Sequence, residues 1–300
     1  MAAWIPVTLF AALAQTLRFV LQKQLRSTAL STAGATFSRF LFSWPLLIAL
    51  ALGYGAMRGM EMPQINPLFW VYGLAGAVGQ ITATMCTVAL FQHRNFAVGV
   101  TFKKTEVLQT VLIGLVFLGE TVSWGAMGAI LIGLFGVLAL SDTPDDAGSL
   151  RDRFMTPATG LGLASGVLFG VAAVGYRGAA LELDGGDVFL RAAFGLAILT
   201  LCQIAIMVVW LVIKEPGEIG RVLRAWRVAG LVGVTSMLGS LGWFTAFGLQ
   251  KAAYVKALGQ SELLFSFLAS TFLFGERSTA RELFGIGALC LSVVLIILLG

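Results

Sequence analysis

Apolar residues along this chain are gathered into long runs that short polar segments separate. A bilayer core about 30 Å thick needs roughly 20 mainly apolar residues in a helix, and lipid offers no hydrogen-bond partners for the edges of an open sheet. The pattern therefore predicts an all-α integral membrane protein with ten transmembrane helices. The predicted spans are residues 4–22, 31–56, 67–89, 96–118, 124–140, 158–176, 188–213, 226–249, 254–274 and 283–299.

A charge-rich stretch interrupts this pattern at mid-chain. Residues 141–157 contain two prolines and six charged side chains, which are typical of a linker. We therefore divide the chain into a first five-helix half, residues 1–140, and a second, residues 158–300. The first apolar run has no cleavage-site pattern after it, so we expect it to be a retained span and not a removable signal peptide.

Composition supports the membrane interpretation. Of 300 residues, 58% are hydrophobic and 12% are charged, whereas soluble domains average about 25% charged. The net charge of +5 comes without a basic run interleaved with aromatics, so we expect no nucleic-acid partner. Cys86, Cys202 and Cys290 all fall in apolar runs, where a thiol behaves as a small hydrophobe, and we predict no disulfide, metal site or cofactor.

The two halves repeat each other. A shift of 156 residues aligns Glu106 with Glu262, Gly119 with Gly275, and Glu120 with Glu276. A shift of 152 aligns Phe37-Ser38-Arg39 with Phe189-Leu190-Arg191. Because each half has an odd number of predicted crossings, the second half enters from the opposite face, and the halves are expected to be inverted repeats.

These repeated motifs resemble the drug/metabolite transporter superfamily, specifically its ten-helix EamA-type members. The resemblance is carried by Arg39-Phe40 in the second span with Arg191 in the seventh, and by the ends of the fourth and ninth spans at Leu118-Gly119-Glu120 and Phe274-Gly275-Glu276. It implies a central cavity lined by helices 1, 3, 4, 6, 8 and 9, in a protein that exports amino acids, drugs or other metabolites.

The chain departs from the family pattern in two places. The related four-helix multidrug exporters have a glutamate in their first helix, but no acid occurs here between Met1 and Lys23. Many relatives also have a proline midway along the fourth and ninth helices. Here residues 103–106 read Lys-Lys-Thr-Glu and residues 259–262 read Gly-Gln-Ser-Glu, so a polar centre replaces the proline.

Glu106 and Glu262 lie near the middle of their predicted spans. An ionisable group at that depth costs a few kcal/mol or more, so it normally faces a cavity or a partner. The functional interpretation places both acids in the substrate and proton site. The structural alternative is a static pair with Lys103, which shares a helix face with Glu106. Since Gly259 matches Lys103 in the repeat, we expect Glu106 to matter more for folding and Glu262 for transport.

The cations allow two interpretations as well. Lys103, Lys104 and Lys256 either hold a substrate carboxylate or pair with the glutamates. Arg39 and Arg191 lie nearer the starts of their spans, where a guanidinium reaches interfacial water or carbonyls, and a structural role is favoured for both.

Turn and cavity residues complete the set of candidates. We interpret Gly119, Glu120, Gly275 and Glu276 as turn and capping elements, because a carboxylate is stabilised at a helix N-terminus. Polar or aromatic positions on helices that the family uses as cavity wall are candidates for substrate contact, with helix-to-helix hydrogen bonding as the alternative. They are Gln15, Arg18, Gln80, Thr84, Ser236, Ser240 and Trp243.

The leading hypothesis is a secondary transporter, an exporter of small metabolites such as amino acids, with proton coupling as an option. Alternatives are a lipid translocator or a non-transporting membrane scaffold. An intramembrane enzyme is disfavoured, because the single histidine, His93, lies in a short connection. We expect a monomer or homodimer in the plasma (inner) membrane. The positive-inside rule puts both termini outside, whereas the family resemblance implies both inside, so orientation stays open.

Overall fold

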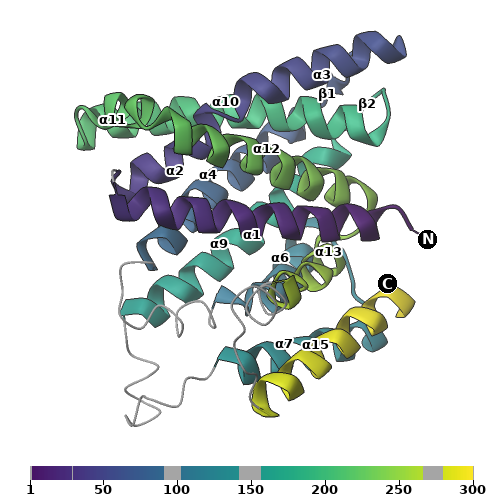
Figure 1. The fold of residues 1–300 in the computed structure, drawn as a ribbon. Coiled ribbons are helices and arrows are strands. Elements are labelled where there is room, and N and C mark those ends of the chain that lie inside the picture. Colours follow the sequence, from purple (N-terminus) through teal and green to yellow (C-terminus); the bar gives the residue numbers. More distant parts are fainter. Residues whose placement is uncertain (1, 29, 91–102, 142–156, 266–279, 300) are drawn as a thin grey trace.

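The computed structural model of the chain describes residues 2–28, 30–90, 103–141, 157–265 and 280–299 (Figure 1). About 86% of this described part is helical. Its sheet consists of two short antiparallel strands, β1 (Gln64–Ile65) and β2 (Leu183–Asp184), with Gln64 opposite Asp184. The predicted all-α class is therefore confirmed.

The described helices follow the predicted spans closely. They are α1 (Trp4–Thr28), α2 (Thr32–Leu41), α3 (Trp44–Arg58), α4 (Pro67–Leu90), α6 (Glu106–Leu118), α7 (Trp124–Ser141), α9 (Pro157–Leu181), α10 (Val188–Lys214), α11 (Glu218–Arg224), α12 (Trp226–Leu249), α13 (Ala252–Gly259) and α15 (Ala280–Leu299). The predicted linker lies almost entirely outside the described residues, as do parts of the predicted spans 96–118 and 254–274.

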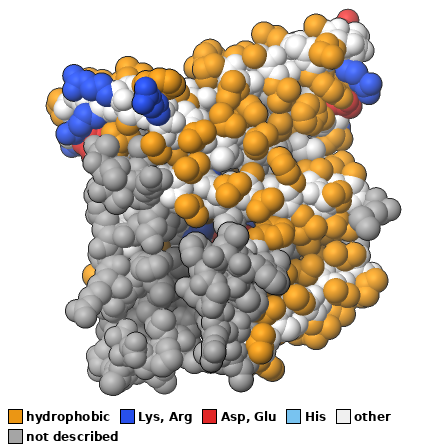
Figure 2. Space-filling view, in the orientation of Figure 1, with side chains coloured by type: hydrophobic (Ala, Val, Ile, Leu, Met, Phe, Trp, Pro, Cys, Tyr) orange, Lys and Arg blue, Asp and Glu red, His pale blue; other side chains and the backbone are white. Residues whose placement is uncertain are grey.

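The helices belong to a membrane protein. Within the described residues, six helical segments are long and apolar enough to cross a bilayer, and three shorter apolar helices accompany them. Apolar side chains are spread over the described part of the visible surface, and basic side chains gather at one end, over α11 (Figure 2). Exposed residues such as Val71, Val116 and Phe135 would form far larger apolar patches than a soluble monomer tolerates.

The second predicted span is broken where one continuous helix was expected. α2 ends at Leu41 and α3 begins at Trp44. Pro45 lies in the first turn of α3, where it lacks an N–H and its ring would clash with the carbonyl four residues earlier. Residues 31–56 therefore form two helices, and α2 can approach the centre of the molecule at its own angle.

Two further interruptions occur at matching places in the repeat. Lys104 and Thr105 form a turn just before α6, and Gln260 and Ser261 form a turn just after α13. Each interruption directly precedes a glutamate, Glu106 or Glu262. These turns are consistent with the prediction that polar residues replace the family's prolines. The prediction that residues 96–118 and 254–274 each form one unbroken helix is wrong at these two turns.

The positions at which α2 and α10 begin correct the alignment of Arg39 with Arg191. Ser31 caps α2 by accepting from the Gly34 N–H, and Asp187 caps α10 by accepting from the Leu190 N–H. These caps are 156 residues apart, so Arg39 lies one turn deeper in its helix than Arg191 does. The alignment of Arg39 with Arg191 at a shift of 152 is therefore wrong by one helical turn.

Two tight helix pairs form the centre of the bundle, and each joins one helix from each half. In the pair α4–α9, a Cβ on Gly175 would lie 2.6 Å from the Tyr72 carbonyl oxygen and 2.8 Å from Gly76 Cα. In the pair α1–α12, a Cβ on Gly242 would lie 2.8 Å from Ala11 Cβ. Small residues thus let the backbones touch, as is common between membrane helices.

A third pair, α7–α15, lies at the edge of the bundle (Figure 1). A Cβ on Gly136 would lie 2.7 Å from the Gly285 carbonyl oxygen, and the Ser292 hydroxyl donates to the Ala129 carbonyl at 2.7 Å. Close packing therefore accounts for the glycines of α7 that face α15. Gly128 is an exception, because a Cβ there meets no described atom within 4 Å.

We expect Gly175→Ala to destabilise the detergent-solubilised protein by about 1–3 kcal/mol, the usual cost of overpacking. Gly160→Ala is the matched control in the same helix: a Cβ on Gly160 meets no described atom within 4 Å, and alanine favours the helix by up to about 1 kcal/mol. Thermal unfolding followed by circular dichroism measures both. Equal losses would contradict the close packing of α4 and α9.

Candidate functional site

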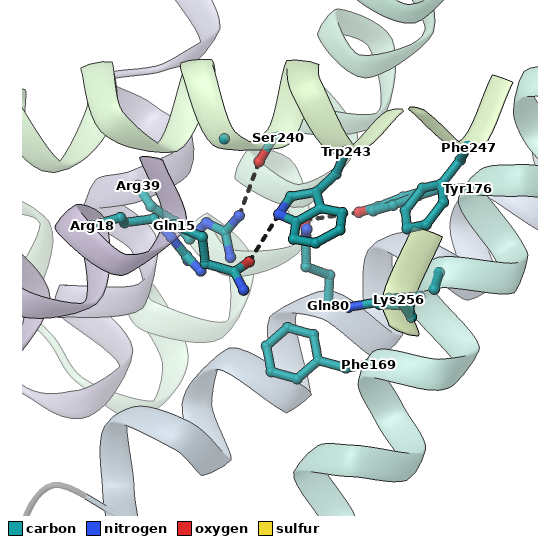
Figure 3. Close-up of a pocket in the computed structure, with 13 residues that line it drawn as sticks. Gln15, Arg18, Arg39, Gln80, Phe169, Tyr176, Ser240, Trp243, Phe247 and Lys256 are labelled. Atoms are coloured by element: carbon teal, nitrogen blue, oxygen red, sulfur yellow. Dashed lines mark hydrogen bonds between the residues drawn. The ribbon is translucent and has the colours of Figure 1, made fainter. Parts of the chain in front are cut away.

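A polar cavity lies between the two central helix pairs (Figure 3). Its free volume is about 30 Å³, room for no more than a few water molecules. The lining residues are Gln15, Arg18, Arg39, Gln80, Phe169, Ala172, Ala173, Tyr176, Gly239, Ser240, Trp243, Phe247 and Lys256. They come from α1, α2, α4, α9, α12 and α13, so five of the six helices implied by the resemblance line the cavity, and α2 is an addition.

Arg39 projects from α2 into this cavity. Its Nε donates to Ser236 Oγ at 3.1 Å, its Nη1 to Thr84 Oγ1 at 2.9 Å and its Nη2 to Ser240 Oγ at 3.1 Å. Arg39 as a whole is 2% exposed. The expectation that Arg39 reaches interfacial water or carbonyls is therefore wrong, because α2 directs it inward toward three hydroxyls on α4 and α12.

Arg18 lies on the same side of the cavity and is also 2% exposed. Its guanidinium carbon lies 4.3 Å from the centroid of the Phe19 ring. Its Nη1 is buried and has no hydrogen-bond partner among the described residues. Figure 3 shows Arg18 and Arg39 directed into the same space, with Gln15 beside them. The structure thus brings two buried guanidinium groups together at one end of the cavity.

A second network closes the wall on the side of α4 and α9. Tyr176 donates its hydroxyl proton to Gln80 Oε1 at 2.8 Å, and Gln203 Nε2 donates to the same oxygen at 2.9 Å. Sequence reasoning selected Gln80 but missed Tyr176 and Gln203. A glutamine in the middle of the mainly apolar run 188–213 is the signal that could have identified Gln203.

Gln15 links the cavity to one of the glutamates. Trp243 Nε1 donates to Gln15 Oε1 at 3.1 Å, and Gln15 Nε2 donates to Glu262 Oε2 at 3.1 Å. Glu262 also forms an ion pair with Lys104. A ligand that displaces Trp243 or Gln15 therefore acts directly on the surroundings of this buried ion pair.

Glu106 is paired with the other half of the chain. Lys256 Nζ of α13 lies 3.5 Å from Glu106 Oε1, and Glu106 Oε2 is buried with no hydrogen-bond partner in the described part of the chain. Lys103 Nζ lies over the rings of Phe19 and Phe169, at 4.5 and 4.8 Å. The suggested Lys103–Glu106 pair is therefore corrected: the lysine in contact with Glu106 comes from α13, and both glutamates bind a lysine across the two halves.

The predicted turn at the end of α6 is present, but the capping role of Glu120 is not. Gly119 adopts a left-handed conformation with φ 64° and ends the helix. Glu120 pairs with Arg177 at 2.9 Å, and α7 begins only at Trp124. Gly275 and Glu276 lie outside the described residues.

Arg191 is separate from the cavity. Its Nη1 donates to the Leu183 carbonyl at 3.2 Å, which agrees with the structural role favoured from sequence. This bond ties the start of α10 to β2.

The cavity region carries an excess of positive charge. Among the described residues around it, five basic side chains face two carboxylates: Arg18, Arg39, Lys103, Lys104 and Lys256 against Glu106 and Glu262. No group of three or more metal-ligating side chains occurs in the part of the chain that the structure describes. The arrangement is suited to holding a solute by charge and hydrogen bonds.

Comparison with known proteins identifies the fold alone. No protein-family model matches the chain, and no curated protein matches it. A solved structure described as "Crystal structure of protein" superimposes with a TM-score of 0.71 at 14% sequence identity. The match covers 99% of this chain and 98% of that chain, so the two share their fold over nearly their full lengths.

We expect Lys104 and Glu262 to be energetically coupled. Lys104→Met or Glu262→Gln alone leaves a buried partner and should cost about 3–5 kcal/mol, as for buried pairs in soluble proteins. The double variant should cost less than the sum, with a coupling free energy of about 1–3 kcal/mol. Unfolding of the purified protein in detergent measures this cycle.

The matched cycle uses Lys256→Met and Glu106→Gln. In this pair Nζ and Oε1 are 3.5 Å apart, and its coupling free energy should also be about 1–3 kcal/mol. Additive losses in the Lys104–Glu262 cycle would show that this ion pair does not contribute to stability.

Proposed function

We propose that this protein is a multi-pass secondary transporter that carries small metabolites across the plasma (inner) membrane. One observation carries the proposal: a bundle of lipid-facing apolar helices encloses a polar cavity lined by two arginines, a lysine and two glutamines. Ionisable groups at this depth are costly, and in membrane proteins they commonly mark substrate and ion pathways.

The packing of the helices supports an inverted repeat of ten crossings. Under the 156-residue shift, α1 corresponds to α9 and α4 to α12. The equivalent of the pair α1–α12 in the other half is therefore the pair α9–α4, and both pairs are present. A two-fold axis in the membrane plane would relate the two pairs in this way. The start of α1 and the end of α15 lie on the same side of the bundle (Figure 1), which agrees with an even number of crossings.

The contacts at the two ends of the bundle follow the same exchange. At one end β1, from the first half, pairs with β2 at the start of the seventh predicted span. At the opposite end Glu218, at the start of α11, accepts from the Ser31 N–H at 2.6 Å beside the start of α2. Each contact joins the start of a second helix in one half to a connection in the other.

The small size of the cavity favours alternating access over a permanent channel. A space of about 30 Å³ is too small for an amino acid or a similar metabolite, so the walls must separate to admit one. The interruptions before Glu106 and Glu262 are suitable hinge points, because broken helices near the midplane form binding sites in many transporters. Substrate entry from one side would then require closure on the other.

Glu262 is our candidate for proton coupling. It connects to the cavity through the hydrogen bonds of Gln15 and Trp243, whereas Glu106 connects to it through an ion pair with Lys256, which also lines the cavity. Protonation of Glu262 would weaken its bond to Lys104 and change the charge beside the cavity. Its charged partner is Lys104, and Lys104 in turn lies close enough to Lys103, Glu106 and Lys256 to feel their charges.

We expect Glu262→Gln to lose pH-driven transport, because glutamine keeps the shape of a protonated acid but cannot ionise. The measurement is uptake of a panel of labelled amino acids and carboxylic acids into proteoliposomes under an imposed pH gradient. Glu106→Gln at equal folded content is the matched control and should retain flux, although the folded yield of both variants should fall because each leaves a buried lysine without its partner.

Normal pH-driven flux in Glu262→Gln would exclude this acid as the coupling site. Failure of the wild-type protein to move any solute in the panel, together with movement of lipid between leaflets, would favour a lipid translocator instead.

The topology has its own test. In a variant without Cys86, Cys202 and Cys290, single cysteines replace Gln64 in β1 or Arg224 at the end of α11, both of which are exposed. An impermeant maleimide applied to intact cells should label only one of the two, since they lie at opposite ends of the bundle (Figure 1). The labelled position also reports the orientation. Labelling of both would contradict the multi-pass arrangement.

A further inference from the structure

We infer that the transported solute is an organic anion without an ammonium group, and that its oxyanion binds between Arg18 and Arg39. This inference rests on the transport function proposed above and names the class of its substrate. A carboxylate and a phosphate share the chemistry required, which is a small oxyanion on an apolar body.

The two arginines that line the cavity carry permanent charges. A buried lysine can release its proton, but an arginine stays charged in a protein. Among the described residues, neither Arg18 nor Arg39 forms an ion pair with an acid, and each is 2% exposed. Such a pair of charges is unfavourable inside a membrane unless an anion compensates them.

The hydrogen bonds separate the roles of the two arginines. Arg39 is held by Thr84, Ser236 and Ser240, so its guanidinium is fixed before a ligand arrives. Arg18 has no such support, and its buried Nη1 retains an unused donor. A planar guanidinium with free donors is suited to paired hydrogen bonds with a carboxylate or phosphate. Arg18 is therefore the group whose hydrogen bonding an anion would complete.

The other end of the cavity suits an apolar body. Figure 3 shows the guanidinium groups at one end and the rings of Trp243, Phe247 and Tyr176 at the other, with Phe169 below them. The rings of Trp243 and Phe247 stack with centroids 6.1 Å apart. A flat or aliphatic group attached to the oxyanion would lie against these rings and displace little polar surface.

The charges near the cavity disfavour an ammonium group on the solute. Lys256 also lines the cavity, and its Nζ lies 5.1 Å from the Trp243 ring centroid. The nearby acids, Glu106 and Glu262, are paired with Lys256 and Lys104 and are absent from the described lining. A zwitterionic amino acid would therefore place its ammonium among cations. The sequence predicts small metabolites such as amino acids as substrates, whereas the charges around the cavity favour organic anions over amino acids.

The test measures binding by the full chain, purified in detergent, through its thermal unfolding. The probes are benzoate and phenyl phosphate as anions, benzamide as the neutral analogue of benzoate, and L-phenylalanine as a zwitterion, all at matched ionic strength. We expect at least one of the two anions to raise the melting temperature in a concentration-dependent way. Benzamide and L-phenylalanine should leave it unchanged.

Two variants locate the site. Arg18→Gln should weaken anion binding at least about tenfold, the usual worth of a charge-assisted hydrogen bond. It should also leave the ligand-free protein no less stable, because it removes a buried charge that has no acidic partner among the described residues. Arg191→Gln is the control: it removes an arginine outside the cavity and should keep the full anion-dependent shift even if its own melting temperature falls.

Three results would overturn the inference: no shift with either anion, an equal shift with benzamide or L-phenylalanine, or an unchanged anion shift in Arg18→Gln. If that variant does not fold, the comparison of benzoate with benzamide on the wild-type protein still decides. Anion binding that depends on Arg18 without any solute flux would refute the transporter proposal and keep the anion site. Flux of amino acids without anion binding would refute the anion site and keep the transporter proposal.

Discussion

The low polarity of a bilayer is the constraint on which this structure depends. A charged side chain at the centre of a membrane helix costs about 2.5–3.5 kcal/mol on insertion scales. The chain nonetheless places seven ionisable side chains around its central cavity. Two lysine–glutamate pairs account for four of them, and Lys103 is stabilised by the rings of Phe19 and Phe169. Arg18 and Arg39 have no acidic partner among the described residues, and in our proposal they make the cavity prefer anions.

The spans could be predicted from sequence because lipid imposes length and apolarity on each helix separately. The boundaries of α12 agree with the predicted residues 226–249, for example. The interruption between α2 and α3 was predictable in principle, since Pro45 lies within the run, but helix-breaking prolines also occur inside membrane helices. Hydropathy alone therefore does not distinguish a kinked span from a broken one.

The site was less predictable because its contacts join residues far apart in the chain. Thr84 and Ser240 were selected as polar positions on helices that the family uses as cavity wall, and both accept from Arg39. The role of Arg39 itself depends on the direction of α2, which no local pattern reports. Likewise, the sequence offered Lys103 as the neighbour of Glu106, whereas the contact is made by Lys256, 150 residues away. Spacing along one helix does not reveal which neighbouring helix supplies a partner.

The pairing of α1 with α12 and of α4 with α9 has a consequence for biogenesis. Helices enter the membrane in chain order, but the small-residue face of α4 at Gly76 and Gly79 has its partner in α9, and Ala11 of α1 meets Gly242 of α12. Until the second half has been inserted, these close-packing faces of the first half are left without their partners. Contacts this distant in sequence form slowly. The first half is therefore an incomplete intermediate during synthesis, and substitutions at the glycines of α9 or α12 should impair assembly of helices made long before them.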